Sequence, residues 1–252
     1  MSKKKIISVG FYFPGDVVDY VGFNSDTSLL DADIIIYSPN IFEYSHRYDS
    51  LHQGKPALND SASFALQEQS AHWRRELKDA CDAGKTTFIF LNKLEEVFIA
   101  TGEKQFSGTG RNRVTTNIVT NYDNYQSIPF TLDPVNSKGT LMVLSKDSEL
   151  ISSYWGMFSE SSKYHVYLKG KVSSPLIKTK TGDRTVGAIV RLKSGSGAFV
   201  LLPYLDTGKA EFEEERDDGE VYWTQAAIEF GTKLKSSLVE ISKAIKQSTS
   251  ST

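Results

Sequence analysis

The side chains best suited to covalent catalysis are few in this chain. Cys81 is the only cysteine among 252 residues, so it can form no disulfide within the chain and cannot belong to a multi-cysteine metal site. A cysteine nucleophile needs a nearby base and an electropositive, accessible setting. Cys81 instead falls on the apolar stripe of a predicted helix, so we expect it to be buried as a small hydrophobic side chain.

The other reactive residue types form no catalytic or metal-binding pattern. The chain lacks the Gly-x-Ser-x-Gly motif that presents a nucleophilic serine at a sharp turn. Its four histidines are scattered without the spacing of metal ligands, at His46, His52, His72 and His165. We therefore expect no catalytic residue, no bound metal and no cofactor.

Two glycine-containing segments resemble parts of phosphate-binding loops. Gly84-Lys85-Thr86-Thr87 matches the end of a P-loop, but Asp79 occupies the position of its first glycine and a helix precedes the loop. We interpret Gly84 as the cap of that helix. The segment Gly108–Arg113 begins like a dinucleotide loop, but Arg113 replaces the third glycine. Its two guanidinium groups, with Lys104, either form a solvated basic loop or bind an anion or a phosphate backbone.

Charge is unevenly distributed in the second half of the chain. Between Lys163 and Lys193, eight basic residues are opposed by one acid, a net charge of 8 − 1 = +7. Between Asp206 and Glu220, eight acids are opposed by two basic residues, a net charge of −6. These regions either neutralise each other or face solvent, or the basic one contacts nucleic acid or an acidic protein. The candidate contact residues of this basic surface are Lys169, Lys171, Lys178, Lys180 and Arg184.

Short apolar segments bounded by turn residues predict an α/β fold. We expect strands at Lys5–Tyr12, Asp33–Tyr37 and Thr86–Leu91, with a helix over Ser61–Ala83 before the third strand. This order indicates an open, mostly parallel or mixed sheet flanked by helices. Further strands are expected at Arg113–Thr120, Gly139–Leu144, Tyr164–Leu168, Leu176–Thr179, Val186–Leu192 and Ala198–Leu202, and a short helix at Ser148–Phe158.

A long amphipathic helix is predicted at the C-terminal end. We divide the chain into an α/β domain, residues 1–221, and a C-terminal helix with its tail, residues 222–252. The helix covers Tyr222–Gln247, and its apolar residues recur every three or four positions. This face either packs on the sheet, or its distal half docks a protein partner through Leu234, Leu238, Ile241 and Ile245.

Three segments resemble class I glutamine amidotransferase-like and ThuA-like domains. They are the opening strand Ile6–Phe13 with Pro14-Gly15-Asp16, the strand Asp33–Tyr37, and the glycine-rich segment Ser194–Pro203 that enters an apolar strand. The resemblance implies a flavodoxin-like fold. Amidotransferase members place a cysteine at a sharp strand-to-helix turn, and this chain has none there, so the resemblance implies a fold and not that activity.

The carboxyl ends of the expected strands predict the position of a ligand site. Ligands of open α/β sheets bind beyond these ends. If the sheet is parallel here, polar residues that follow the strands converge there. The candidate pocket residues are Asp16, Asn40, Glu43, Asn92 and Arg111.

Composition sets bounds on function. The net charge of −2 gives no overall attraction to nucleic acid or to an anionic membrane. No apolar run approaches the roughly 20 residues that span a bilayer. We expect no membrane association and a cytoplasmic location. The interpretation with the fewest assumptions is a non-catalytic binding or scaffold subunit with a protein partner. The alternatives are a nucleic-acid-binding accessory protein that uses the Lys163–Lys193 surface, and an atypical hydrolase or nucleotide-binding enzyme.

Overall fold

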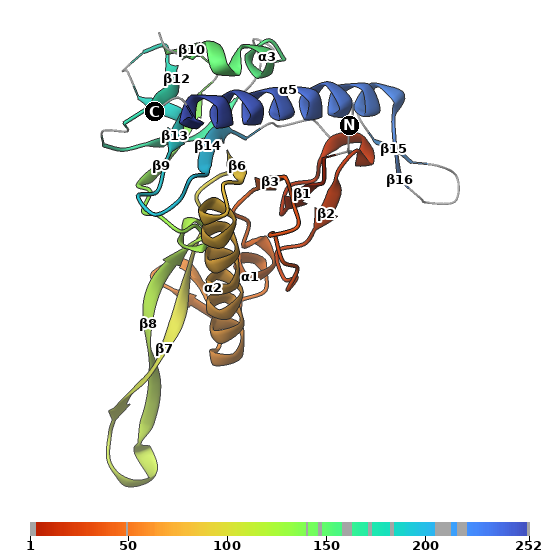
Figure 1. The fold of residues 1–252 in the computed structure, drawn as a ribbon. Coiled ribbons are helices and arrows are strands. Elements are labelled where there is room, and N and C mark those ends of the chain that lie inside the picture. Colours follow the sequence, from red (N-terminus) through yellow and green to blue (C-terminus); the bar gives the residue numbers. More distant parts are fainter. Residues whose placement is uncertain are drawn as a thin grey trace.

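A mixed β-sheet forms the centre of the molecule (Figure 1). The computed structural model describes residues 4–48, 50–139, 141–145, 148–157, 163–170, 173–181, 184–204, 213–215 and 221–250. Along the main path of the sheet the strands are β10 (Met142–Leu144), β12 (Pro175–Thr179), β13 (Thr185–Val190), β14 (Ala198–Pro203), β6 (Thr86–Leu91), β3 (Ile34–Tyr37), β1 (Ile6–Val9) and β2 (Asp19–Val21). The strands β11 (Tyr164–Leu168) and β9 (Pro134–Gly139) join it beside β13.

The sheet divides into a parallel part and an antiparallel part. Strands β14, β6, β3, β1 and β2 run parallel to one another, whereas β13 is antiparallel to β14 and to β12, and β12 is antiparallel to β10. The prediction of an α/β fold with a mixed sheet is therefore confirmed. Strands β3, β6 and β14 are buried at every position. Continuous apolar strands of this kind are typical of a sheet that is covered on both faces.

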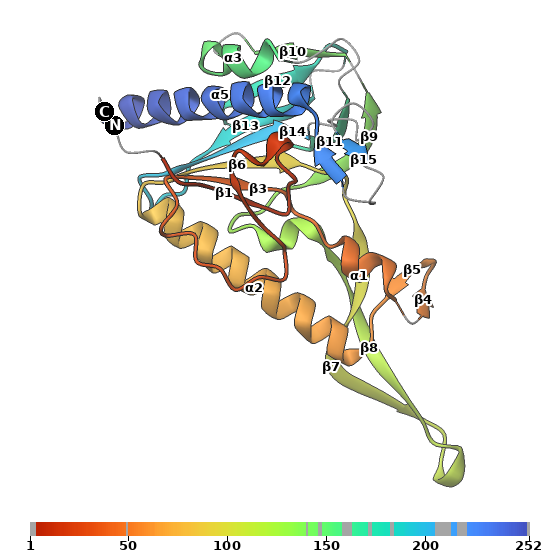
Figure 2. The same ribbon diagram turned by 90° about the vertical axis from the view of Figure 1, so that its right-hand side faces the viewer.

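Two long helices cover opposite faces of the sheet (Figure 2). Helix α2 (Asp60–Asp82) packs Trp73 and Leu77 against one face, and helix α5 (Gln225–Ser250) packs on the other. Alternate residues of β3 follow this division, because Ile35 contacts the α2 layer while Ile34 contacts the α5 layer. Of the described helices, none combines the length and the apolar character that crossing a bilayer requires.

Local signals explain where these helices begin and where α5 sits. The side chain of Asn59 accepts the Ala62 amide at 2.8 Å and caps α2, which begins one residue before the predicted start at Ser61. Helix α5 lies against the 3₁₀ turn η1 (Pro14–Asp16). At Gly231 a Cβ atom would come within 2.0 Å of the Pro14 carbonyl oxygen. Glycine at this position therefore permits the close approach of helix and turn.

A second, smaller sheet carries a long hairpin that projects from the body (Figures 1 and 2). Its strands are β4 (Ser50–His52), β5 (Lys55–Ala57), β7 (Glu96–Ser107) and β8 (Val114–Asp123). The sequence predicted β8 in part and missed β7. The remaining short elements are α1 (Phe42–His46), η2 (Gly110–Asn112), η3 (Asn124–Ser127), η4 (Glu149–Ile151), α3 (Ser152–Trp155), β15 (Glu213–Glu215) and β16 (Val221–Trp223).

Two predicted elements have a different form in the structure. The single strand expected at Gly139–Leu144 is the end of β9 followed by β10. The short helix expected at Ser148–Phe158 is the 3₁₀ turn η4 continued by α3, and Phe158 lies outside the described residues. The strands expected at Val186–Leu192 and Ala198–Leu202 correspond to β13 and β14, which are antiparallel neighbours.

Candidate functional sites

The only thiol is buried in the core. Cys81 is 1% exposed and packs with Trp73, Leu77 and Phe199 between α2 and the sheet. Burial and the neighbouring Asp82 charge raise the pKa of Cys81, which keeps the sulfur protonated and a poor nucleophile. Within the described part of the chain, no three His, Cys, Asp or Glu side chains are grouped as metal ligands would be.

A hollow of about 190 Å³ lies at the carboxyl ends of three parallel strands. Gly10 follows β1, Gly22 follows β2, and Asn40 lies three residues after β3. The other lining residues are Tyr20, Phe23, Asn24, Phe42, Glu43 and Tyr44. This strand-end pocket contains two of the predicted pocket residues, Asn40 and Glu43.

The other three predicted pocket residues do not line this hollow. Asp16 belongs to η1, which packs on α5. Asn92 turns its side-chain oxygen to the Lys93 amide at 2.7 Å, and its carbonyl accepts the Tyr125 hydroxyl. Arg111 lies in η2 at the tip of the projecting hairpin, far from the strand ends (Figure 1). Its assignment to the pocket is corrected, because the hairpin carries it away from the sheet.

A short hydrogen-bond chain fixes the polar groups of the strand-end pocket. The amide of Asn24 donates to Glu43 Oε2 at 2.5 Å, and the Tyr44 hydroxyl donates to Asn24 Oδ1 at 2.9 Å. Burial raises the pKa of Tyr20, with further contributions from Tyr12 and Glu43, and burial and Glu43 also raise the pKa of Tyr44. Both phenols therefore stay protonated at neutral pH and keep a hydroxyl donor.

The fold brings only some residues of the predicted basic surface close together. Lys169 follows β11 and Arg184 precedes β13, and they lie next to the directly paired residues Leu168 and Thr185. Lys180 begins the turn between β12 and β13, so these three exposed cations share one end of neighbouring strands. The Arg184 guanidinium lies 4.3 Å from the centre of the Tyr167 ring.

The other two residues of that surface stand apart. Lys178 is half-buried and lines a different hollow, of about 600 Å³, beside Ser145 and Ser174. Lys171 lies outside the described residues, as does the acidic segment Asp206–Glu220 apart from β15.

The apolar face of the C-terminal helix is buried against the sheet. The four residues proposed to dock a partner are at most 2% exposed and belong to the core, namely Leu234, Leu238, Ile241 and Ile245. This packing corrects their assignment to a partner-binding surface, because a side chain buried within its own chain offers no area to another protein.

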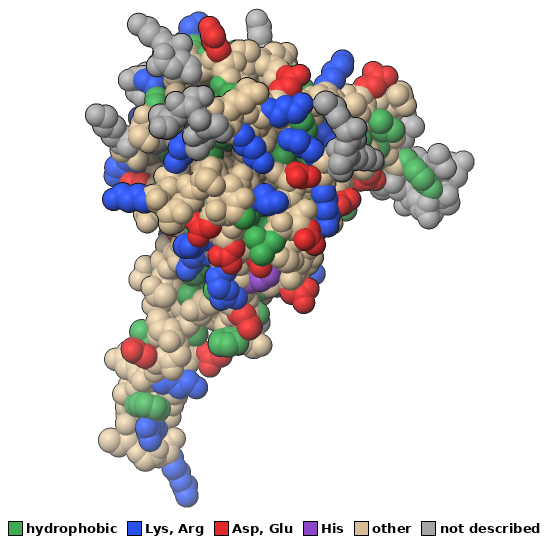
Figure 3. Space-filling view, in the orientation of Figure 1, with side chains coloured by type: hydrophobic (Ala, Val, Ile, Leu, Met, Phe, Trp, Pro, Cys, Tyr) green, Lys and Arg blue, Asp and Glu red, His purple; other side chains and the backbone are tan. Residues whose placement is uncertain are grey.

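The hairpin of β7 and β8 offers a surface that the core does not use. We call residues 104–117 the arm. The arm contains Lys104, Arg111 and Arg113 and no Asp or Glu, a net charge of 3 − 0 = +3 in a chain whose total is −2. Every residue of the arm is exposed except Asn117, which is half-buried. The exposed residues include two large hydrophobic side chains, Val114 at 56% and Phe106 at 54%. Figure 3 shows Lys and Arg side chains gathered toward its end.

A bulge redirects the hairpin where the arm begins. Ala100 pairs with Val119 and Lys104 pairs with Asn117, so the three residues of β7 between them face Ile118 alone. Gly102 within the bulge has a φ of 84°, a backbone conformation that favours glycine. Thr101 stabilises the bulge, since its hydroxyl donates to the Ile118 carbonyl at 3.0 Å.

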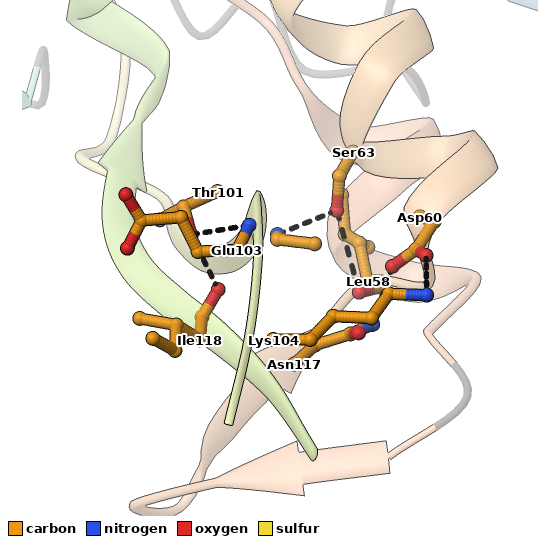
Figure 4. A network of polar contacts seen from close by, with 9 residues as sticks. Leu58, Asp60, Ser63, Thr101, Glu103, Lys104, Asn117 and Ile118 are labelled. Carbon is orange, nitrogen blue, oxygen red and sulfur yellow. Dashed lines mark hydrogen bonds and ion pairs between the residues drawn. The ribbon is translucent and has the colours of Figure 1, made fainter. Parts of the chain in front are cut away.

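A single carboxylate ties the arm to the body (Figure 4). Asp60, in the first turn of α2, accepts a hydrogen bond from the Asn117 amide and lies 3.8 Å from Lys104 Nζ. Lys104 and Asn117 are the first cross-strand pair beyond the bulge. Among the described residues, these are the only polar side-chain contacts between the arm and the body. We call them the Asp60 latch.

Comparisons with known proteins find no similar family model, no similar curated protein and no similar solved structure. The function must therefore be argued from the geometry of these surfaces.

Proposed function

We propose that this protein is a non-catalytic binding subunit whose arm docks onto an acidic surface of a protein partner. The observation that carries the proposal is the arm itself, residues 104–117, which is cationic, exposed and held in one direction by the Asp60 latch. An isolated two-stranded hairpin is at best marginally stable in water. A fixed projecting hairpin contributes little to the core, and a partner-binding role accounts for it.

The side chains of the arm favour a protein partner over nucleic acid. Interfaces between proteins are enriched in Arg and aromatic residues and depleted in Lys. The arm presents Arg113 with its guanidinium 4.1 Å from the centre of the exposed Phe106 ring, and Val114 stands beside them. Proteins that hold duplexes through charge commonly neutralise about 6–10 phosphates. The arm has three cations, and one of them, Lys104, is already close to Asp60.

Two features support a binding role rather than a catalytic one. The buried thiol of Cys81 with its raised pKa provides no activated nucleophile. The described residues that line the strand-end pocket include no histidine and a single carboxylate, Glu43. The phenols of Tyr20 and Tyr44 have raised pKa values and stay protonated at neutral pH, which makes them poor groups for exchanging a proton with a substrate.

The proposed cytoplasmic location and flavodoxin-like fold belong to the same account. The parallel strands follow the order β2-β1-β3-β6-β14. Numbered along the chain within this set, the order is 2-1-3-4-5, as in flavodoxin-like sheets. This order supports a flavodoxin-like domain, as the amidotransferase-like resemblance implies. A lone, protonated thiol is compatible with a reducing compartment.

The test is a comparison of two charge-reversal variants. The Arg111→Glu/Arg113→Glu variant changes the charge of the arm by −4. The control, Lys169→Glu/Lys180→Glu, changes the charge of the basic surface by the same amount. Each tagged full-length chain is purified natively from its host, the partner is identified by mass spectrometry, and binding to the purified partner is then measured by calorimetry.

We expect the arm variant to bind the partner at least tenfold more weakly, while the control binds as the wild type does. If the arm variant binds the partner as tightly as the wild type does, the proposal is contradicted. Loss of binding in the control alone would identify the basic surface as the docking site. Recovery of nucleic acid in place of a protein would favour the nucleic-acid-binding alternative.

A further inference from the structure

The strand-end pocket is lined by a glycine that the backbone does not require. Gly10 must be glycine, because its φ is 67° and a Cβ atom would lie 2.6 Å from the Ser38 carbonyl oxygen. Gly22 differs, since it has no positive φ and a Cβ atom there would meet nothing within 4 Å. Gly22 lines the hollow, and a side chain at this position would cause no backbone strain and no clash at its Cβ atom. The backbone therefore does not account for glycine here.

The position of this pocket is one where α/β sheets bind ligands. The end of β1 is bonded to both neighbours, through Gly10 N to the Val21 carbonyl at 3.0 Å and through Ser38 N to the Val9 carbonyl at 2.9 Å. The chain passes from β1 to β2 on one side and on to β3 on the other. Crevices outside the carboxyl ends of strands at such a change of order are the usual ligand sites.

The charge of the pocket selects against anions. Among the described residues that line the pocket, Glu43 is the only carboxylate and there is no Lys or Arg. The only hydrogen bond that this carboxylate accepts from described residues comes from Asn24, which leaves Oε1 available. A phosphate or carboxylate ligand would face Glu43 without a compensating cation. This arrangement disfavours the nucleotide-binding alternative at this position.

The aromatic side chains of the pocket are suited to a cation. The aromatic residues Tyr20, Phe42 and Tyr44 line the hollow together with Glu43. Cations are attracted to aromatic faces within about 6 Å, and a carboxylate adds a charge-assisted hydrogen bond. Tyr12 lies 4.5 Å from Tyr20, ring centre to ring centre, and continues the aromatic surface beyond the rim.

We infer that the strand-end pocket binds a guanidinium or primary ammonium group carried on a short alkyl stem. The volume of about 190 Å³ sets the size of the ligand. Sites for drug-sized ligands occupy about 300–1,000 Å³, so this hollow takes a head group and its stem and not a nucleotide. The group belongs either to a free small molecule or to a Lys or Arg side chain of a peptide. The inference does not depend on the arm.

The test is NMR titration of the full-length protein with matched probes. n-Butylguanidinium is the cationic probe, and n-butylurea is its neutral counterpart of nearly the same shape. Inorganic phosphate is the anionic probe. The backbone amides of Gly10, Gly22 and Asn24 report on binding at the pocket.

Two variants separate charge from space. Glu43→Gln removes the charge and retains the shape, whereas Gly22→Gln fills the hollow and retains the charge. Glu103→Gln, in the bulge of the hairpin, is the matched control for loss of a carboxylate. Thermal unfolding of each variant verifies that the fold is intact.

We expect saturable shifts with n-butylguanidinium and at least tenfold weaker binding of n-butylurea, a difference of about 1.4 kcal/mol. Glu43→Gln should weaken the binding of n-butylguanidinium by a similar factor, and Gly22→Gln should abolish it. Glu103→Gln should leave the affinity for n-butylguanidinium unchanged. Equal binding of the two butyl probes, binding of phosphate at these amides, or no saturable shift would overturn the inference.

A further titration distinguishes a free small molecule from a peptide side chain as the source of the cationic group. If a blocked Ala-Arg-Ala peptide binds at least as tightly as n-butylguanidinium, the ligand is a peptide side chain. If the peptide is excluded while n-butylguanidinium binds, the ligand is a free small molecule.

Discussion

The Asp60 latch leads to a quantitative prediction about the direction of the arm. We consider the Asp60→Ala variant, which removes both contacts. The ion pair with Lys104 spans 3.8 Å between side chains that are 47% and 58% exposed. Exposed pairs contribute about 0.2–1 kcal/mol. The hydrogen bond from Asn117 to the carboxylate adds roughly 0.5–1.5 kcal/mol.

The sum, about 1–2 kcal/mol, is small for the whole protein but large for the arm. A free energy of this size changes the ratio of latched to unlatched arms by a factor of about 5–30. Because no other polar side-chain contact ties the arm to the described body, we expect Asp60→Ala to free its direction while the melting temperature changes by only a few degrees.

Electron–electron double resonance measures this directly. Nitroxide labels on Thr109→Cys at the tip and Glu68→Cys on α2 report the distance from arm to body. We expect a narrow distribution for the latched protein, a broad one for Asp60→Ala, and an intermediate one for Asp60→Asn, which retains an acceptor for Asn117. Identical distributions in all three proteins would refute the latch.

Three further predictions concern the core. Gly231→Ala should lower the melting temperature by at least about 2–4 °C, because the clash with the Pro14 carbonyl outweighs the roughly 1 kcal/mol gain in helix propensity. A rise in the melting temperature measured by calorimetry would show that α5 does not approach η1 this closely. Cys81 should resist thiol reagents such as dithionitrobenzoate in the native protein and react on unfolding, and labelling at the rate of a free thiol would contradict its burial. Burial raises the pKa of Tyr37, Tyr125 and Tyr154. Their contribution to stability is present below the unfolded pKa of about 10 and is lost as pH rises above that value. In an alkaline titration monitored by phenolate absorbance, the protein should therefore unfold before these three tyrosines ionise or as they do so. Reversible ionisation of these tyrosines in the folded protein would refute this prediction.

The sequence predicted the covered sheet because burial leaves a direct pattern. The apolar runs of β3 and β6 have no polar residue on either face to interrupt them beyond two buried threonines at the start of β6. The stripes of α2 and α5 likewise recur with helical spacing, and their residues are buried as that spacing indicates. Local capping placed both ends of α2 within one residue.

The sequence could not predict the hairpin because its outer half has no buried face. In β7 the first residues are apolar, but Thr101–Ser107 are all exposed and contain Gly102, so neither alternation nor apolarity indicates a strand. Missing β7 left Arg111 in a loop of unknown direction, and it was assigned to the strand ends. The only available signal was the absence of acids between Lys104 and Arg113, which marked the segment as a cationic surface.

The strand-end pocket was predicted in part for a related reason. Asn40 and Glu43 follow the well-marked strand β3, and the sequence identified both. Tyr20 lies within the short strand β2 and Asn24 follows that strand. Two of the three residues of β2 are exposed, so no buried run marks it as a strand in the sequence.

Hydrogen–deuterium exchange of the natively purified complex tests the docking role of the arm most directly. The amides of residues 104–117 are compared in the free protein and in the protein bound to its partner. We expect strong slowing of exchange within the arm on binding, and no change at the end of the sheet that carries Lys169 and Lys180. Unaltered exchange in the arm, with protection elsewhere on the protein, would contradict the docking role of the arm.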